Sequence, residues 1–351
     1  MTAVLAPERA PLRLVAPRRP LRVVDVALFY GERSGGIRTY LDAKAAYAAR
    51  TGAFEHRLVI PGAQHDVSGP TCALPSVRVA ASNGYRWPLG SRPLVDLLQM
   101  LEPDVVLLHD PFWAPKAAVA AALPGPDALY RPALGRWLKR VYGHVDAVMS
   151  ACDPLGDTGR EATLPLRFGL DPAFFPSGEV RRSDHVLYAG RLGREKGVFE
   201  LLDAAARSEE PWPLWLMGTG TAEQQIAARI RRLGLTDRVR MVGHESDREA
   251  LARAYESARC VVMPGALETF GLVAFEAAAS GAAVVACDAA PSARVIGPLA
   301  ETFPAGDIDA LLAAVERARA GTPNRLAAAR FAAAHRWENA FAAELADLEA
   351  L

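Results

Sequence analysis

The residues best suited to chemistry gather at a strand-to-helix junction in the second half of the chain, in the segment PGALETFGLVAFEAAASGAAVVA (264–286). The backbone N–H groups left unpaired by the first helical turn would be those of Thr269, Phe270, Gly271 and Leu272. Such a terminus attracts phosphate through its free N–H groups and a dipole equivalent to about half a positive charge. Glu268 lies beside this anion site and would accept hydrogen bonds from hydroxyl groups, which points to a sugar attached to the phosphate.

A second segment, YAGRLGREKG (188–197), leaves a predicted strand at Gly190 and supplies two cations, Arg191 and Lys196. Two fixed cations at the mouth of a sheet could bind a diphosphate and neutralise the charge that develops as it leaves. Lys196 is one of only four lysines among 40 Lys and Arg residues, so lysine is not the default cation of this chain. A flexible charged turn is the alternative explanation.

The first half of the chain offers two weaker candidates. Gly35 and Gly36 follow the first predicted strand, where paired glycines let the backbone approach a phosphate or a sugar. His109 ends the predicted strand DVVLLH, and its imidazole could meet a sugar hydroxyl or a developing charge. Glycine pairs are common in turns and strand-end histidines are often structural, so these features gain weight only beside the other motifs.

The elements that must position these residues alternate between strands and helices. Apolar, β-branched runs predict strands at 21–30, 56–62, 104–110, 145–151, 185–190, 213–218, 238–243, 260–265 and 282–287. Helices are predicted at 197–208, 222–233, 247–257 and 270–280. The alternation predicts an α/β protein with two Rossmann-like domains that face each other across a cleft. Ligands would collect there, at the carboxyl ends of the strands.

Changes in composition along the chain predict the domain bounds. A mobile N-terminal arm (1–20) precedes a first Rossmann-like domain (21–168), a linker (169–183), a second Rossmann-like domain (184–324) and a C-terminal helical segment (325–351). One long helix is expected from Arg325 to Leu351. It carries Trp337 and Phe341 and is a candidate for packing back across the first domain.

Composition excludes several classes of protein. Of the 351 residues, 51% are hydrophobic and 23% charged, so the chain is expected to fold. The 40 basic and 40 acidic residues give a formal net charge of zero, which argues against a dedicated nucleic-acid binder. Four widely spaced cysteines favour neither a zinc site nor a disulfide framework. We find no apolar run of membrane-spanning length and no signal peptide, and we expect a cytoplasmic protein.

Taken together, these motifs resemble the retaining nucleotide-sugar glycosyltransferases of family 4, which have the two-domain GT-B fold. The resemblance runs from SGGIRTY through DVVLLHDP, VDAVMSA and RFGLD to YAGRLGREKG, RVRMVGH, ETFGLVAFEAAASG and PAGD (304–307). The motif ETFGLVAFEAAASG is highly specific, GRLGREKG is moderately specific, and the glycine pair counts only in their company. Two departures stand out: Phe168 replaces the usual hinge Asn, and CDAAPSARVIG (287–297) lacks the glycine pair often seen after the last strand.

The resemblance implies a role for each matched residue. Arg191 and Lys196 would bind the donor diphosphate, Glu268 the hydroxyls of the donor sugar, and Glu276 the nucleotide ribose. His109 would lie near the reacting sugar, and Gly243 and His244 would bracket the base. The implied catalytic residues are His109, Arg191, Lys196 and Glu268. The implied donor-binding residues are Gly35, Gly36, Gly190, Arg191, Lys196, Gly243, His244, Glu268, Thr269, Phe270, Gly271, Leu272 and Glu276.

The implied reaction moves a hexose from a UDP- or GDP-linked donor to an acceptor hydroxyl on a glycan, a lipid or a small molecule. Transfer would occur on the front face with retention, the leaving phosphate taking the acceptor proton. No metal and no cofactor are expected, because the two cations neutralise the leaving group. The base, the hexose, the acceptor and the oligomeric state stay open.

Other functions remain as alternatives. A nucleotide-sugar epimerase of the same fold and a non-catalytic nucleotide-sugar-binding protein are the nearest. An NAD-dependent oxidoreductase is disfavoured, because GTGTAEQQ (218–225) lacks the third glycine of the dinucleotide fingerprint. The segment RPALGRWLKRVYGH (131–144) has two interpretations, docking on an anionic membrane that carries a lipid-linked acceptor, or packing inside the first domain.

Overall fold

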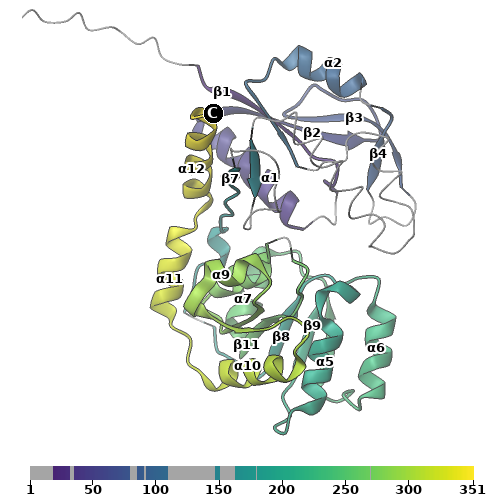
Figure 1. Ribbon diagram of the computed structural model, residues 1–351, viewed down its shortest axis with the longest axis vertical. Coiled ribbons are helices and arrows are strands. Elements are labelled where there is room, and N and C mark those ends of the chain that lie inside the picture. Colours follow the sequence, from purple (N-terminus) through teal and green to yellow (C-terminus); the bar gives the residue numbers. More distant parts are fainter. Residues whose placement is uncertain are drawn as a thin grey trace, which may run out of the picture. The chain divides into compact units, whose positions relative to one another are not determined.

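A computed structural model of the chain describes residues 19–31, 35–79, 85–90, 92–109, 147–150, 163–178, 180–268 and 270–351. These residues form two compact units, one within 1–123 and one within 124–351. Each unit contains a mainly parallel sheet with helices, so the predicted α/β class with two Rossmann-like regions is confirmed (Figure 1). Most of the predicted arm and all of the segment 131–144 lie outside the described residues. The predicted domain bounds stay a prediction.

The first unit is built on a five-stranded sheet with the order β4-β3-β2-β1-β5. Its strands are β1 (Leu21–Val26), β2 (Phe54–Gly62), β3 (Thr71–Arg78), β4 (Arg86–Pro88) and β5 (Val105–Leu108), and its helices are α1 (Gly36–Thr51) and α2 (Arg92–Leu101). All neighbours pair in parallel except β3 and β4. The interior strand β1 is buried from Val23 to Val26, and one of these four residues, the fully buried Asp25, is charged.

The second unit is built on a six-stranded, entirely parallel sheet with the order β10-β9-β8-β11-β12-β13. Its strands are β8 (Val186–Ala189), β9 (Leu214–Met217), β10 (Val239–Gly243), β11 (Cys260–Met263), β12 (Val284–Cys287) and β13 (Ala300–Phe303). The chain starts at the centre with β8, builds outward to β10, then returns to β11 and builds to the other edge. The order therefore reverses between β8 and β11.

Each strand of this sheet is followed by a helix (Figure 1). These helices are α5 (Val198–Arg207), α6 (Glu223–Arg232), α7 (Arg248–Ser257), α8 (Leu272–Ala279), α9 (Pro291–Ile296) and α10 (Ile308–Ala320). Three 3-10 turns, η1 (Pro172–Phe174), η2 (Arg194–Lys196) and η3 (Gly297–Leu299), and a separate parallel pair, β6 (Val148–Ser150) with β7 (Thr163–Pro165), complete this part. No helix of the described residues is both long and apolar enough to cross a membrane.

The predicted single helix from Arg325 to Leu351 is wrong, because the structure has two helices, α11 (Arg325–Ala334) and α12 (Trp337–Glu349). The backbone N–H of Leu170 donates to the carbonyl of His335 at 2.7 Å, and Leu170 forms a parallel bridge with Arg336. A strand-like contact at this point requires extended backbone, which Arg336 adopts with ψ 149°. The helix therefore stops and restarts where the 169–170 segment binds it.

Candidate active site

Two loops of the second unit leave the sheet where the strand order reverses. Residues 190–197 follow β8 and residues 264–271 follow β11, and these two strands are hydrogen-bonded neighbours. In open parallel sheets, ligands bind outside the carboxyl ends of the strands at this switch point. The predicted residues on these two loops are Gly190, Arg191, Lys196, Glu268, Phe270 and Gly271. Thr269 lies outside the described residues.

The two loops touch through their backbones at Gly197. Its φ is +69°, and a Cβ added there would lie 2.7 Å from the carbonyl carbon and oxygen of Pro264 and 3.0 Å from the nitrogen of Gly265. Because these partner atoms are backbone, they cannot turn aside as a flexible side chain would. Only glycine fits, and this contact fixes the distance between Lys196, the preceding residue, and the second loop.

We expect Gly197→Ala to destabilise the fold more than Gly234→Ala. Gly234 has nearly the same φ, +68°, but a Cβ there meets nothing within 4 Å. Alanine at Gly234 should therefore cost only the left-handed backbone strain, roughly 1–2 kcal/mol. The added clash at Gly197 should bring the loss to about 3 kcal/mol or more. Urea titration measures both losses, and equal values would contradict the contact between the loops.

Lys196 and Glu268 are in direct contact across the two loops. Nζ of Lys196 donates to Oε1 of Glu268 at 2.8 Å, and the two side chains are only 19% and 17% exposed. A pair so little exposed is less screened than a surface ion pair. A cation suited to a phosphate and a carboxylate suited to hydroxyl groups therefore lie side by side.

Arg191 lies on the same loop as Lys196, but its guanidinium pairs with Glu195 at 2.9 Å, and both side chains are exposed. Tyr188 of β8 holds this loop in place, because its hydroxyl donates to the Arg191 carbonyl at 2.7 Å. Burial, together with the nearby carboxylates of Glu268 and Glu195, raises the pKa of Tyr188 above its ordinary value. The phenol therefore stays protonated and keeps donating.

The start of α8 leaves backbone donors free beside Glu268. Gly271 caps this helix with φ +98° and no side-chain hydrogen bond, and the first helical bond runs from the N–H of Phe275 to the Gly271 carbonyl. The N–H groups of residues 272–274 thus have no partner within the helix. The sequence predicted that this helix begins at Phe270. It begins instead at Leu272, because the backbone of Gly271 is left-handed.

The side chain of Phe270 belongs to the core. It is buried and stacks on Phe168 with ring centroids 4.4 Å apart, and it meets Phe275 edge-on at 5.2 Å. Any contact of Phe270 with a ligand must therefore come from its backbone. Phe168, at the position where the resembling family commonly has asparagine, supports the loop that carries Glu268.

Glu276 lies on α8, one turn after its start, and is half-buried. The hydroxyl of Tyr255 donates to its Oε2 at 3.4 Å. Burial raises the pKa of Glu276 to about 7, against the opposing influence of the Arg248 guanidinium and the Tyr255 hydrogen bond. This acid is therefore near half-ionised at neutral pH.

The two residues predicted to bracket a base lie at the edge of the sheet. Gly243 ends β10 with φ +80°, and its carbonyl accepts a hydrogen bond of 2.5 Å from the N–H of Gly218. His244 follows it and is exposed. Two strands, β9 and β8, separate β10 from the switch point within the sheet.

In the first unit, Gly35 caps the start of α1 and Gly36 is the first helical residue. Gly35 is exposed, and a Cβ built there meets nothing within 4 Å. Its carbonyl accepts hydrogen bonds from the N–H groups of Arg38 and Thr39. No side chain caps the start of α1 at Gly35. Among the described residues, nothing therefore blocks the approach of a group to the backbone at Gly35.

His109, at the end of β5, belongs to a buried network around Asp25. The Asp25 carboxylate receives Nε2 of His109 at 2.5 Å, Nε2 of His56 at 2.8 Å and Nζ of Lys44 at 3.1 Å. Burial acts to raise the pKa of Asp25, but Lys44 and the two imidazoles outweigh it and hold the pKa well below its usual value. The network is thus built on an ionised aspartate.

Asp25, Lys44 and His56 were not predicted as site residues. The signals were present but weak: Asp25 is the one acidic residue inside the mainly apolar run LRVVDVALFY, and Lys44 is one of four lysines. The two lysines of the described residues, Lys44 and Lys196, are both paired with carboxylates at low exposure.

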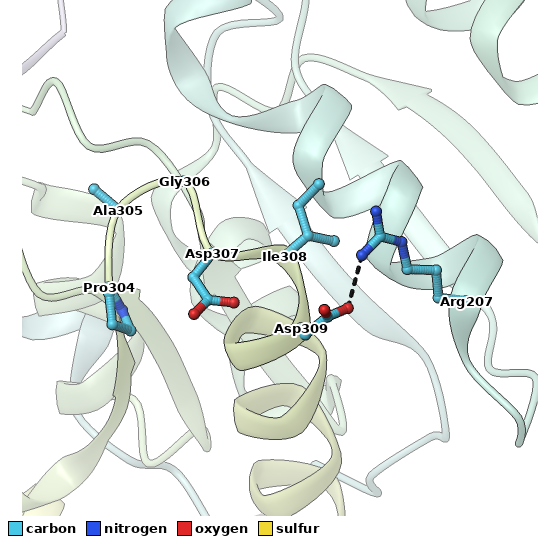
Figure 2. Close-up of a pocket in the computed structure, with 7 residues that line it drawn as sticks. All are labelled: Arg207, Pro304, Ala305, Gly306, Asp307, Ile308 and Asp309. Atoms are coloured by element: carbon cyan, nitrogen blue, oxygen red, sulfur yellow. Dashed lines mark hydrogen bonds and ion pairs between the residues drawn. The ribbon is translucent and has the colours of Figure 1, made fainter.

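A surface pocket of about 600 Å³ lies elsewhere in the second unit. Figure 2 shows the Arg207 guanidinium, from the end of α5, reaching the Asp309 carboxylate in the first turn of α10, 2.7 Å away. The remaining lining comes from residues 304–308, and none of the predicted site residues is among them. Within the described residues, no three His, Cys, Asp or Glu side chains are grouped to hold a metal ion.

The proteins that this chain matches are glycosyltransferases. Residues 172–334 match the family model described as glycosyl transferases group 1. The GDP-mannose-dependent alpha-(1-6)-phosphatidylinositol dimannoside mannosyltransferase of Mycobacterium tuberculosis is 28% identical over 375 residues, covering 94% of this chain and 97% of that protein. The D-inositol 3-phosphate glycosyltransferase of Jonesia denitrificans is 36% identical, over 38% of this chain and 32% of that protein.

Two solved structures show the same fold over nearly the whole chain. Sucrose-phosphate synthase from Thermosynechococcus elongatus superposes with a TM-score of 0.72 at 19% identity, covering 95% of this chain and 98% of that one. Anabaena HepE, solved in complex with UDP and glucose, gives 0.69 at 17% identity, covering 94% and 100%. Together with the family match, these likenesses support a glycosyltransferase of the GT-B fold.

Proposed function

We propose that this chain is a retaining glycosyltransferase that moves a hexose from a nucleoside diphosphate sugar to an acceptor hydroxyl. The observation that carries the proposal is the Lys196–Glu268 contact beside the uncapped start of α8. A diphosphate needs positive charge, and a sugar needs hydrogen-bond acceptors. A nucleotide sugar joins both requirements in one molecule, with the phosphate directly bonded to the sugar.

The electrostatics of the loops favour a diphosphate as leaving group. Lys196, Arg191 and the start of α8, which carries about half a positive charge, all lie at the carboxyl end of β8 or β11. Before a donor binds, Glu268 cancels part of this charge through its contact with Lys196. When hydroxyl groups occupy the carboxylate, Lys196 is free to neutralise the phosphate, so sugar and phosphate recognition depend on each other.

The proposed chemistry is a front-face exchange. The bond between C1 of the hexose and the phosphate oxygen breaks, and the acceptor oxygen bonds to C1 on the same face. The acceptor proton passes to the leaving phosphate, so no protein base is needed. Arg191 and Lys196 stabilise the negative charge on the diphosphate, which is the task of a metal ion in other transferases.

GDP-mannose is the donor that we propose to test first, because the M. tuberculosis relative, aligned along 94% of this chain, is named for it. UDP-glucose is the second donor, since HepE was solved in complex with it. For the acceptor, the same relative supports a hydroxyl of a mannosylated inositol lipid. That acceptor would require this chain to work at a membrane surface.

The decisive experiment is a product assay with purified full-length protein. GDP-mannose or UDP-glucose is incubated with and without the lipid acceptor, and products are identified by mass spectrometry and by the anomeric coupling in NMR spectra. We expect glycosylated acceptor with retained configuration, at a rate that excess EDTA leaves unchanged. Inverted product would overturn the mechanism, and loss of the rate in EDTA would overturn the metal-independent leaving-group step.

The same assay separates the alternatives. An epimerase would change the hexose while leaving it attached to the nucleotide, and a binding protein would return the donor intact. The comparisons do not favour the epimerase, because the family match and the aligned relative are glycosyltransferases. Slow release of free hexose from the donor without acceptor would be further support for transfer.

We expect donor affinity to depend on pH through Glu276. An ionised carboxylate accepts hydrogen bonds from both ribose hydroxyls, so binding should favour ionised Glu276. Because burial raises the pKa of Glu276 to about 7, donor binding at low pH must first remove a proton from Glu276. Affinity should therefore rise about tenfold between about pH 6 and pH 8, as the ionised fraction rises.

Isothermal titration with a nucleotide sugar measures this change. Nucleotide sugars suit the experiment because their diphosphate is esterified at both ends and does not titrate in this range. Glu276→Gln should bind with an affinity that is flat across the range, because its amide does not ionise. A wild-type profile as flat as that of the variant would contradict the assignment of Glu276.

A further inference from the structure

The register of the first sheet explains why four segments meet at Asp25. Asp25 of β1 lies opposite Leu107 of β5 and opposite Leu58 of β2. Side chains two residues apart on a strand share a face, so His109 and His56 point to the same side of the sheet as Asp25. Lys44 reaches this face from α1.

The chemistry of the network determines which ring nitrogens of its two histidines carry a proton. An ionised carboxylate only accepts hydrogen bonds, so each group that meets Asp25 must donate. His109 and His56 both meet it through Nε2, one at each carboxylate oxygen, and therefore carry a proton on Nε2. Lys44 contributes the positive charge that balances the buried carboxylate. Nδ1 of His109 is then the ring nitrogen left for a ligand.

His109 is the member of the network that reaches the surface. Its side chain is 11% exposed, compared with 4% for His56, 2% for Lys44 and none for Asp25. It directly follows β5, and its N–H donates to the Val26 carbonyl at the end of β1. The buried carboxylate therefore holds a ring that lies at the carboxyl edge of the sheet, where parallel sheets bind ligands.

We propose that Asp25 is a positioning residue for His109: it fixes the ring with its proton on Nε2 and leaves Nδ1 to accept a hydrogen bond from a hydroxyl of the transferred hexose. This proposal rests on the proposed function, and on the role near the reacting sugar that the family resemblance implies for His109. Asp25 itself touches neither donor nor acceptor. Its contribution is the orientation and the tautomer of the imidazole.

A double-mutant cycle tests whether Asp25 acts through His109. Asp25→Asn keeps the shape of the side chain but offers one acceptor oxygen and an NH2 group that cannot accept. We expect it to lower kcat on the order of 10- to 100-fold, by analogy with the loss seen when the hydrogen-bond partner of a metal-ligating imidazole is removed. In the His109→Ala background, Asp25→Asn should lower kcat no further. Independent, multiplicative losses would overturn the proposal.

His56→Gln is the matched control, because His56 binds the same carboxylate but is more deeply buried within the sheet. Both Asp25→Asn and His56→Gln should lower the melting temperature, whereas only Asp25→Asn should lower kcat strongly. Donor affinity should change little in either variant. If His56→Gln lowered kcat as much as Asp25→Asn, the network would serve stability alone and the proposal would fail.

Nitrogen NMR of the histidine rings gives a readout that needs no turnover. The His109 signal, assigned by its absence in His109→Ala, should show the Nε2–H tautomer in the wild type and change in Asp25→Asn. An Nδ1–H tautomer in the wild type would overturn the proposal, even if the variant did not fold. A wild-type protein that showed the Nε2–H tautomer but transferred no hexose would instead contradict the proposed function.

Discussion

Lys196→Ala is expected to lower kcat by about 10²- to 10³-fold while the protein stays folded. The Lys196 side chain is less exposed than that of Arg191, the other proposed diphosphate cation. A charge that is shielded from water stabilises the leaving group more than a charge at the surface does. Its loss leaves the Glu268 carboxylate without its partner and the leaving phosphate without a neutralising charge. Initial rates at saturating donor and acceptor measure the effect.

Arg194→Ala is the matched control for Lys196→Ala. Arg194 carries the same charge on the same 3-10 turn, but its guanidinium lies over the ring of Phe199 at 5.5 Å and not against Glu268. Arg194→Ala should retain most of the wild-type kcat. Thermal unfolding of both variants shows whether the fold is intact. Wild-type turnover in Lys196→Ala would refute the assignment of the leaving-group cation.

Glu268→Gln is expected to separate sugar recognition from phosphate recognition. The variant loses the carboxylate that would accept hydrogen bonds from the hexose, so kcat/KM should fall about 10²-fold. At the same time Lys196 loses the carboxylate that occupies it in the empty site at 2.8 Å. The affinity for the nucleoside diphosphate without sugar should therefore stay the same or increase.

Titration of GDP or UDP into both proteins, beside steady-state kinetics with the full donor, checks this opposite behaviour. Glu249→Gln is a suitable control, because Glu249 is exposed on α7 and pairs only weakly with Arg253. A variant that lost affinity for the free diphosphate in parallel with kcat/KM would show that Glu268 serves the loop structure and not the sugar.

The strands of the second unit were predictable from sequence because parallel strands covered on both faces are continuous apolar runs. Strands β8, β11 and β12 are fully buried along their length, and each was predicted within two residues at either end. Strands β3 and β13 were missed. β3 contains Pro75, and β13 is AETF, only one residue of which is buried, so neither has an apolar run.

The contact of Lys196 with Glu268 follows from local motifs, each of which comes directly after a predicted strand. It needs only the additional fact that β8 and β11 are neighbours. The Asp25 network differs, because its members come from β1, α1, β2 and β5 and no local motif joins them. The break between α11 and α12 likewise depends on a hydrogen bond from Leu170, 165 residues away from its acceptor His335.

Because the chain has only four lysines, chemical modification of amines can report selectively on ligand binding at Lys196. Of the four lysines, Lys44 lies on α1 with its side chain almost fully buried, and Lys196 retains a partly accessible ammonium next to Glu268. Acylating reagents should thus modify Lys196 far faster than Lys44. A bound ligand should protect the Lys196 amine from the reagent. The mass of the peptide that carries Lys196 would then measure how much of the intact protein holds ligand.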